Sequence, residues 1–136
     1  MNVKRFVIGC IAVYVVAQIL GFVIHQVLLA ETYASMAEVW RSEAEMISKA
    51  WMMFLTGALW TVVFCYIFTR GYEGKGIAEG LRYGLVIGLF WLPFAYESHV
   101  LYPIPMSLAH IWAVVTIASC IVYGLVIAAI YRPAEA

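Results

Sequence analysis

The chain has 136 residues, of which 65% are hydrophobic and 12% are charged, and its formal net charge is zero. This composition lies far outside the soluble range and predicts a single integral membrane domain over residues 1–136. The balanced charge excludes nucleic acid as a partner, and the absence of aspartate excludes Asp-based catalytic triads and the usual acidic metal clusters.

The first predicted span covers residues 6–30, which as a helix would extend about 37 Å and cross a bilayer. Its small and weakly polar residues recur at steps of three or four, so they share one face. Polar side chains within a membrane nearly always face the interior of a bundle. We therefore expect this face to pack against the other helices, with Gln18 and Gly21 at its centre. Its members are Cys10, Tyr14, Gln18, Gly21 and His25.

Residues 31–49 are the first connection, and their apolar residues, including Tyr33 and Trp40, share one helical face. Ser35 and Glu38 fit a capping box at its start. The segment predicts an amphipathic helix lying in the membrane interface, with both aromatic rings at headgroup level. A docking face for a partner protein is the alternative interpretation.

The second predicted span, residues 50–69, carries Gly57 and Thr61 on its own small-residue face. The connection that follows, residues 70–82, is rich in glycine, which indicates a turn. It has neither a preceding strand nor the Lys-Ser/Thr ending of a phosphate-binding loop. These absences exclude nucleotide binding at this position.

The third predicted span, residues 77–96, contains glycines at steps of four: Gly80, Gly84 and Gly88. In lipid, missing side chains allow two helix backbones to approach closely, so this spacing predicts a glycine-zipper packing face. A short outer loop over residues 97–105 and a fourth span over residues 106–131 complete the chain. The sequence thus predicts an all-α, four-helix membrane bundle with an additional interfacial helix.

The basic residues predict the orientation of this bundle. With four spans, the termini and residues 70–82 share one side, which carries six Lys and Arg residues, whereas the other side carries two. The excess of positive charge places both termini in the cytoplasm. The six are Lys4, Arg5, Arg70, Lys75, Arg82 and Arg132, and the two are Arg41 and Lys49.

The three histidines all fall toward the outer side. His25 and His110 each lie about 7 Å inside a predicted span, and His99 is in the loop near Glu97. Two imidazoles that face each other across a bundle can ligate haem iron or a transition metal, with a carboxylate to orient one of them. Interhelical hydrogen bonding by these histidines is the competing interpretation. A third possibility is a membrane enzyme with Glu97 and His99 as acid and base.

Three stretches, residues 37–46, 66–77 and 80–89, resemble a group of uncharacterised small bacterial inner-membrane proteins with four predicted spans. The resemblance covers most of the chain; it implies a location in a bacterial inner membrane and no catalytic activity. Length and span count are also similar to those of small multidrug-resistance exporters. Those proteins carry a glutamate within the first span, where this chain has Gln18 and no acid.

These observations support three hypotheses for function. The first is a structural or accessory subunit that acts through helix association, with a partner membrane protein or as a homo-oligomer. The second is the binding of haem, a metal or a small ligand at the histidines. The third is a small oligomeric transporter, which would normally need ionisable residues at mid-membrane. The mid-span polar residues here are neutral: Tyr14, Gln18, Thr61, Thr116 and Ser119.

Overall fold

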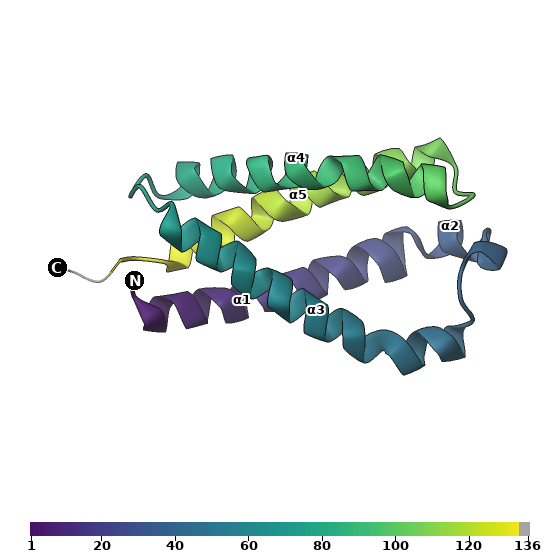
Figure 1. Ribbon diagram of the computed structural model, residues 1–136, viewed down its shortest axis with the longest axis horizontal. Coiled ribbons are helices and arrows are strands. Elements are labelled where there is room, and N and C mark those ends of the chain that lie inside the picture. Colours follow the sequence, from purple (N-terminus) through teal and green to yellow (C-terminus); the bar gives the residue numbers. More distant parts are fainter. Residues whose placement is uncertain (134–136) are drawn as a thin grey trace.

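A computed structural model describes residues 1–133, and these residues form only helices and their connections (Figure 1). Four helical stretches within this part of the chain are long and apolar enough to cross a membrane, namely α1 with its continuation η1, α3, α4 and α5. The prediction of an all-α protein with four such helices is confirmed. The elements are α1 (Val3–Phe22), the π-helical turn η1 (Val23–Leu28), α2 (Ala30–Ala34), the 3-10 turn η2 (Ala37–Val39), α3 (Glu43–Arg70), α4 (Ile77–Leu101) and α5 (Met106–Ile130).

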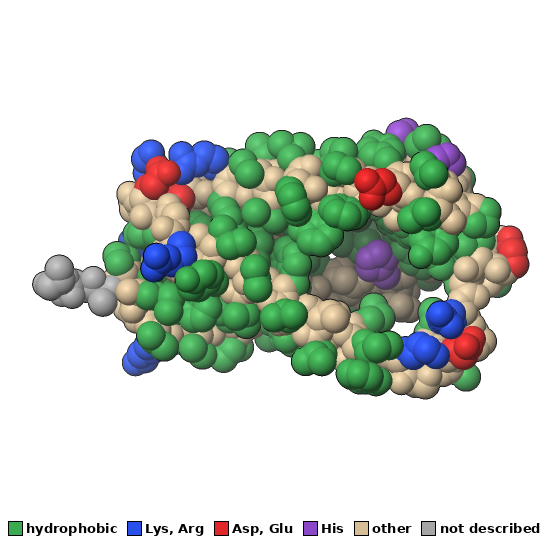
Figure 2. Space-filling model, in the orientation of Figure 1, with side chains coloured by type: hydrophobic (Ala, Val, Ile, Leu, Met, Phe, Trp, Pro, Cys, Tyr) green, Lys and Arg blue, Asp and Glu red, His purple; other side chains and the backbone are tan. Residues whose placement is uncertain are grey.

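The distribution of side chains on the surface is that expected of a bundle that spans a membrane. Lys and Arg side chains gather at the two ends of the molecule, while hydrophobic side chains cover the long sides between them (Figure 2). Burial of those sides from water requires contact with the lipid bilayer. α1 begins and α5 ends at one end of the bundle, called here the terminal end, and α2 lies at the opposite end, called here the α2 end (Figure 1).

The single amphipathic helix predicted over residues 31–49 is wrong. Two short helical pieces, α2 and η2, are followed by an extended Trp40 (φ −102°, ψ 156°), and α3 begins at Glu43 rather than at residue 50. Ser42 caps α3: its side chain accepts from the Glu45 backbone N–H at 3.4 Å and donates to the Glu45 carboxylate at 3.2 Å. Ser42 and Glu45 have the spacing of a capping box, but the Glu45 carboxylate accepts from the Ser42 hydroxyl and not from its backbone N–H. The helix start lies seven residues beyond the expected one at Ser35.

The outer loop expected over residues 97–105 is also shorter than predicted. α4 continues past Pro93 to Leu101, so Glu97 and His99 belong to the helix. The helix ends where Tyr102 becomes extended (φ −120°, ψ 146°). Tyr102 precedes Pro103, and the proline ring disfavours helical backbone in the residue before it.

α4 and α5 form a close antiparallel hairpin, which has the most extensive helix contact in the described chain. The backbones meet where glycine leaves no side chain. A Cβ added to Gly80 or Gly84 would overlap the carbonyl oxygen of Gly124 or Cys120, and one added to Gly88 would lie 2.8 Å from the Cα of Ile117. The hairpin therefore has no room for larger residues at these positions on α4.

The other two helices are held more loosely. α1 packs along α5 and also against α3, whereas α3 has little contact with α5 and crosses the bundle at an angle (Figure 1). α3 consequently diverges from the other helices toward the α2 end (Figure 1). Each end is closed by its own apolar cluster. The terminal-end cluster contains Cys10, Val13, Phe64, Cys65, Phe68, Ile127, Ala128 and Tyr131. The α2-end cluster contains Leu29, Ile104 and Leu108, with Tyr33, Trp40 and Trp112 packed against them.

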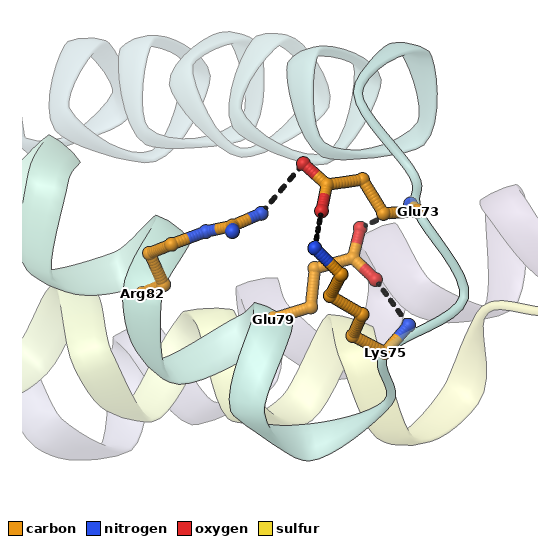
Figure 3. Close-up of polar contacts among 4 residues, drawn as sticks. All are labelled: Glu73, Lys75, Glu79 and Arg82. Carbon is orange, nitrogen blue, oxygen red and sulfur yellow. Dashed lines mark hydrogen bonds and ion pairs between the residues drawn. The ribbon is translucent and has the colours of Figure 1, made fainter.

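The α3–α4 connection is held by a carboxylate that is almost fully buried. Glu79, 4% exposed, accepts the backbone N–H groups of Glu73 and Lys75 at 2.7 and 3.0 Å (Figure 3). Glu73 in turn pairs with the Lys75 ammonium at 2.6 Å and the Arg82 guanidinium at 2.7 Å. These contacts hold the connection against the start of α4, which fixes how α3 enters the bundle.

Candidate intramembrane binding cavity

A cavity of about 350 Å³ lies between α1, α3, α4 and α5. It occupies the space that opens where α3 diverges from the other helices, and a hollow containing a histidine is visible there (Figure 2). Thr116 and Ser119, which line it, lie within about 3 Å of the middle of α5 along the helix axis. The cavity is therefore in the central part of the membrane-spanning region.

A second cavity of about 350 Å³ continues toward the α2 end. Both cavities are lined by the same four residues where they meet: His25, Trp91, Val115 and Thr116. The combined space is in the range of small-molecule binding sites in proteins.

The lining is mainly apolar with several polar side chains, and it carries no Asp, Glu, Lys or Arg. Within residues 1–133, the side chains of Gln18, Trp60 and Trp91 have no hydrogen-bond partner, although each has an N–H that can donate. Thr61 differs, because its hydroxyl donates to the Gly57 carbonyl at 2.8 Å. The cavity thus presents unpaired donors in a region that contains little water.

His25 lines both cavities and is oriented by a hydrogen-bonded chain. Trp112 Nε1–H donates to the Tyr33 hydroxyl oxygen at 2.9 Å, and that oxygen lies 2.7 Å from His25 Nδ1. An indole N–H only donates, so the tyrosine oxygen accepts from Trp112. Among the described residues His25 Nδ1 is the acceptor within reach of the tyrosine proton, and we assign that proton to the bond with Nδ1. Burial raises the pKa of the Tyr33 phenol above its usual value, which keeps that proton on the tyrosine. His25 is therefore held as the tautomer with its proton on Nε2.

The other predicted ligand residues lie elsewhere. His99 Nδ1–H donates to the Ile104 carbonyl at 2.6 Å, and His110 Nδ1 lies 3.2 Å from the Tyr96 hydroxyl. Glu97 is exposed on α4 and lines neither cavity. Within the described residues, no group of three or more His, Cys, Asp or Glu side chains could hold a metal ion. A haem or metal site at these histidines stays a prediction.

The predicted packing residues fall into two groups. Gly80, Gly84 and Gly88 lie against α5, as described above, whereas the other four line the cavity: Gln18, Gly21, Gly57 and Thr61. A Cβ added to Gly21 would meet no atom within 4 Å, so the close helix contact expected there is absent. The polar face of α1 is expected to point toward the other helices because polar side chains avoid lipid, but polarity alone does not distinguish a packed helix contact from a cavity wall.

Sequence reasoning also missed the aromatic part of the site. Trp60, Trp91 and Tyr123 line the cavity from three different helices. The Trp60 ring also packs against Tyr123, with ring centroids 5.7 Å apart. Aromatic residues are common throughout this chain, so no local spacing would have marked these three.

Four long apolar helices, with an open cavity between them, define a small polytopic membrane protein. No protein-family model, curated protein or solved structure matches the chain. The resemblance to small four-span membrane proteins is thus supported at the level of this class, and no family is identified.

Proposed function

We propose that this protein binds a small amphipathic molecule in the intramembrane cavity. The observation that carries the proposal is the set of unpaired donors, including the Gln18 amide and the Trp60 and Trp91 indoles, on the wall of an uncharged cavity. Unpaired polar groups in the membrane interior cost free energy, of about 1–3 kcal/mol each in protein measurements. A ligand that pairs with these groups and fills the apolar remainder removes that cost.

Gly21 offers a direct test, because a side chain added there projects into open space. Gly21→Phe should fill part of the cavity without disturbing the α4–α5 contact. Ile19→Phe is the matched control, since Ile19 is 57% exposed on the outer surface of the same helix. Binding of the neutral fluorescent dye Nile red to detergent-purified protein should weaken at least tenfold in Gly21→Phe and stay unchanged in Ile19→Phe. Equal binding by wild type and Gly21→Phe would exclude the cavity as the site.

A second function, as a structural or accessory subunit, is favoured by the loose attachment of α3. The half of α3 nearest the α2 end exposes large apolar residues, including Trp51, Met53 and Leu55 at 62%, 74% and 62% exposure. A partner membrane protein or a second copy of the chain would pack on this surface by dispersion contacts. Native mass spectrometry after mild extraction tests this function. A complex of fixed stoichiometry would support the function as a subunit, and detection of the monomer alone would contradict it.

We place the protein in a bacterial inner membrane with both termini in the cytoplasm. The six basic residues at the terminal end and the two at the other end support this orientation. The small oligomeric transporter hypothesis has no comparable support, because the cavity contains no Asp, Glu, Lys or Arg to couple transport to an ion.

A further inference from the structure

The chemistry of the cavity wall identifies a class of ligand. We propose that the cavity binds the ring of a neutral, carbonyl-bearing amphiphile of the prenylquinone class, with its tail extending past α3 into the lipid. This inference rests on the proposed function and narrows it from any small amphipathic molecule to one chemical class.

The first argument is the number of N–H donors among the residues of the cavity wall. These residues carry the Gln18 amide N–H₂, the Trp60 and Trp91 indoles and the His25 Nε2–H. The Gln18 amide oxygen is an acceptor, and the remaining polar side chains of the lining that have oxygen are hydroxyls, which can donate as well as accept. His25 Nδ1 already accepts from Tyr33, so it is not an acceptor for a ligand. A ligand that complements this wall must bring acceptors, and quinone carbonyl oxygens are acceptors that carry no proton.

The second argument is the absence of compensating charge. Neither cavity is lined by an Asp, Glu, Lys or Arg side chain. A carboxylate or phosphate in this position would be a buried anion without a cationic partner, which is strongly unfavourable. A neutral ligand meets no such penalty, so fatty acids and phospholipid headgroups are poorer candidates than a quinone.

The third argument is shape. The rings of Trp60, Trp91 and Tyr123 line the first cavity, and aromatic rings pack well against a flat conjugated ring. The cavity volume of about 350 Å³ accommodates a substituted benzoquinone or naphthoquinone ring. Because α3 diverges from the other helices beside the hollow, a hydrophobic tail can leave sideways without crossing the α4–α5 contact (Figure 2).

The test compares two ligands with the same tail. Decylubiquinone has two ring carbonyls, and decylbenzene has none. Protein purified in detergent and freed of lipid-soluble molecules is titrated with each, and binding is followed by tryptophan fluorescence and by equilibrium gel filtration. Decylubiquinone should bind at least tenfold more tightly, since its carbonyls pair with the cavity donors.

Three variants assign the binding to the wall. Gln18→Leu keeps the side-chain size, removes a donor and should weaken decylubiquinone binding about five- to tenfold without changing decylbenzene binding. Trp91→Phe keeps an aromatic ring and removes the indole N–H, and it should independently weaken decylubiquinone binding. Thr56→Val is the control: Thr56 lies on α3 outside both cavities and its hydroxyl donates to the Met52 carbonyl at 2.7 Å, so affinity should change less than twofold. Circular dichroism and gel filtration establish that each variant is folded.

The outcomes separate the two proposals. If both ligands bind equally and Gly21→Phe blocks both, the cavity takes any apolar molecule, and the ligand class is wrong while the proposed function stands. If Gln18→Leu and Trp91→Phe are folded and bind decylubiquinone as wild type does, the donor argument is also refuted. If Gly21→Phe blocks neither ligand, the cavity is not the binding site and both proposals fail.

Discussion

Replacing Gly84 with leucine should destabilise the protein far more than the same replacement at Gly21. A Cβ added to Gly84 would lie 2.6 Å from the Cα of Ile121 and would also overlap the Cys120 carbonyl oxygen. Comfortable carbon–carbon contact begins near 3.5 Å, so α4 and α5 would have to separate by roughly 1 Å for the first carbon alone. The neighbouring atoms belong to the backbone, and they cannot rotate away as a side chain could.

Overpacking of a close contact costs about 1–3 kcal/mol, and the remaining leucine atoms increase the separation further. We expect Gly84→Leu to lower the free energy of unfolding by about 3 kcal/mol. At Gly21, no atom lies within 4 Å of an added Cβ. Gly21→Leu should therefore keep wild-type stability or gain up to about 1 kcal/mol, because leucine favours the helix more than glycine does.

The assay is unfolding of detergent-solubilised protein by increasing SDS, followed by tryptophan fluorescence. Leu85→Ala, at a 40% exposed position one residue from Gly84, measures the effect of altering α4 outside the contact. Ile87 is a poorer control than Leu85, since it packs against the terminal-end cluster. Equal midpoints for Gly84→Leu and Gly21→Leu would refute the argument that the α4–α5 distance is set by the missing side chains.

Five further predictions concern the ends of the bundle. Glu79→Gln should lower thermal stability by about 1–2 kcal/mol, because the amide replaces one of two acceptors for buried backbone N–H groups. The exposed Glu73 has a pKa below its usual value, since the Lys75 ammonium and Arg82 guanidinium donate to its carboxylate. Ionised Glu73 therefore stabilises the folded protein fully above the pKa that this carboxyl has in the unfolded chain, and this stabilisation is lost as the pH falls through its pKa in the folded protein. Stability measured from pH 7 to 3 should fall by this amount in wild type and should lack this fall in Glu73→Gln. Trp112→Phe should cost about 1 kcal/mol through its lost hydrogen bond, whereas Trp40→Phe should cost less, because the Trp40 indole N–H is buried with no partner among the described residues. Ser42→Ala should lower the thermal midpoint by removing the cap of α3, at a cost of about 1 kcal/mol, with Ser35→Ala as the near-neutral comparison. Finally, green fluorescent protein fused after the last residue should fluoresce and alkaline phosphatase fused there should be inactive; the reverse pattern would contradict cytoplasmic termini.

The helices themselves could be predicted from the sequence because long apolar stretches have few alternatives in a membrane. The positions of their ends depended on weaker signals. Ser35 with Glu38 and Ser42 with Glu45 both have the capping-box spacing, and only the second pair starts a helix. The choice depends on Tyr33 and its neighbours, which pack into the α2-end cluster and hold the chain away from a continuous helix.

The candidate site could be predicted only in part. The polar face of α1 predicted that Gln18 and His25 face the other helices, because such groups avoid lipid; both line the cavity, and His25 is exposed there. Whether an interior face is packed or hollow depends on the angle at which α3 crosses α1. That angle is determined by the break before Ser42 and by the carboxylate contacts at the other end of α3, which no local pattern in the helices encodes.

The unequal helix contacts also bear on how the protein is assembled during synthesis. α1 and α3 enter the bilayer first and share only a limited contact, whereas α4 and α5 emerge last, joined by the short segment 102–105. We expect the late hairpin to complete its own packing, because its close contact needs no residue from the first half. The first two helices then dock against it, and the hollow forms at that step. A molecule already dissolved in the membrane could be enclosed as the halves meet, without a separate route of entry.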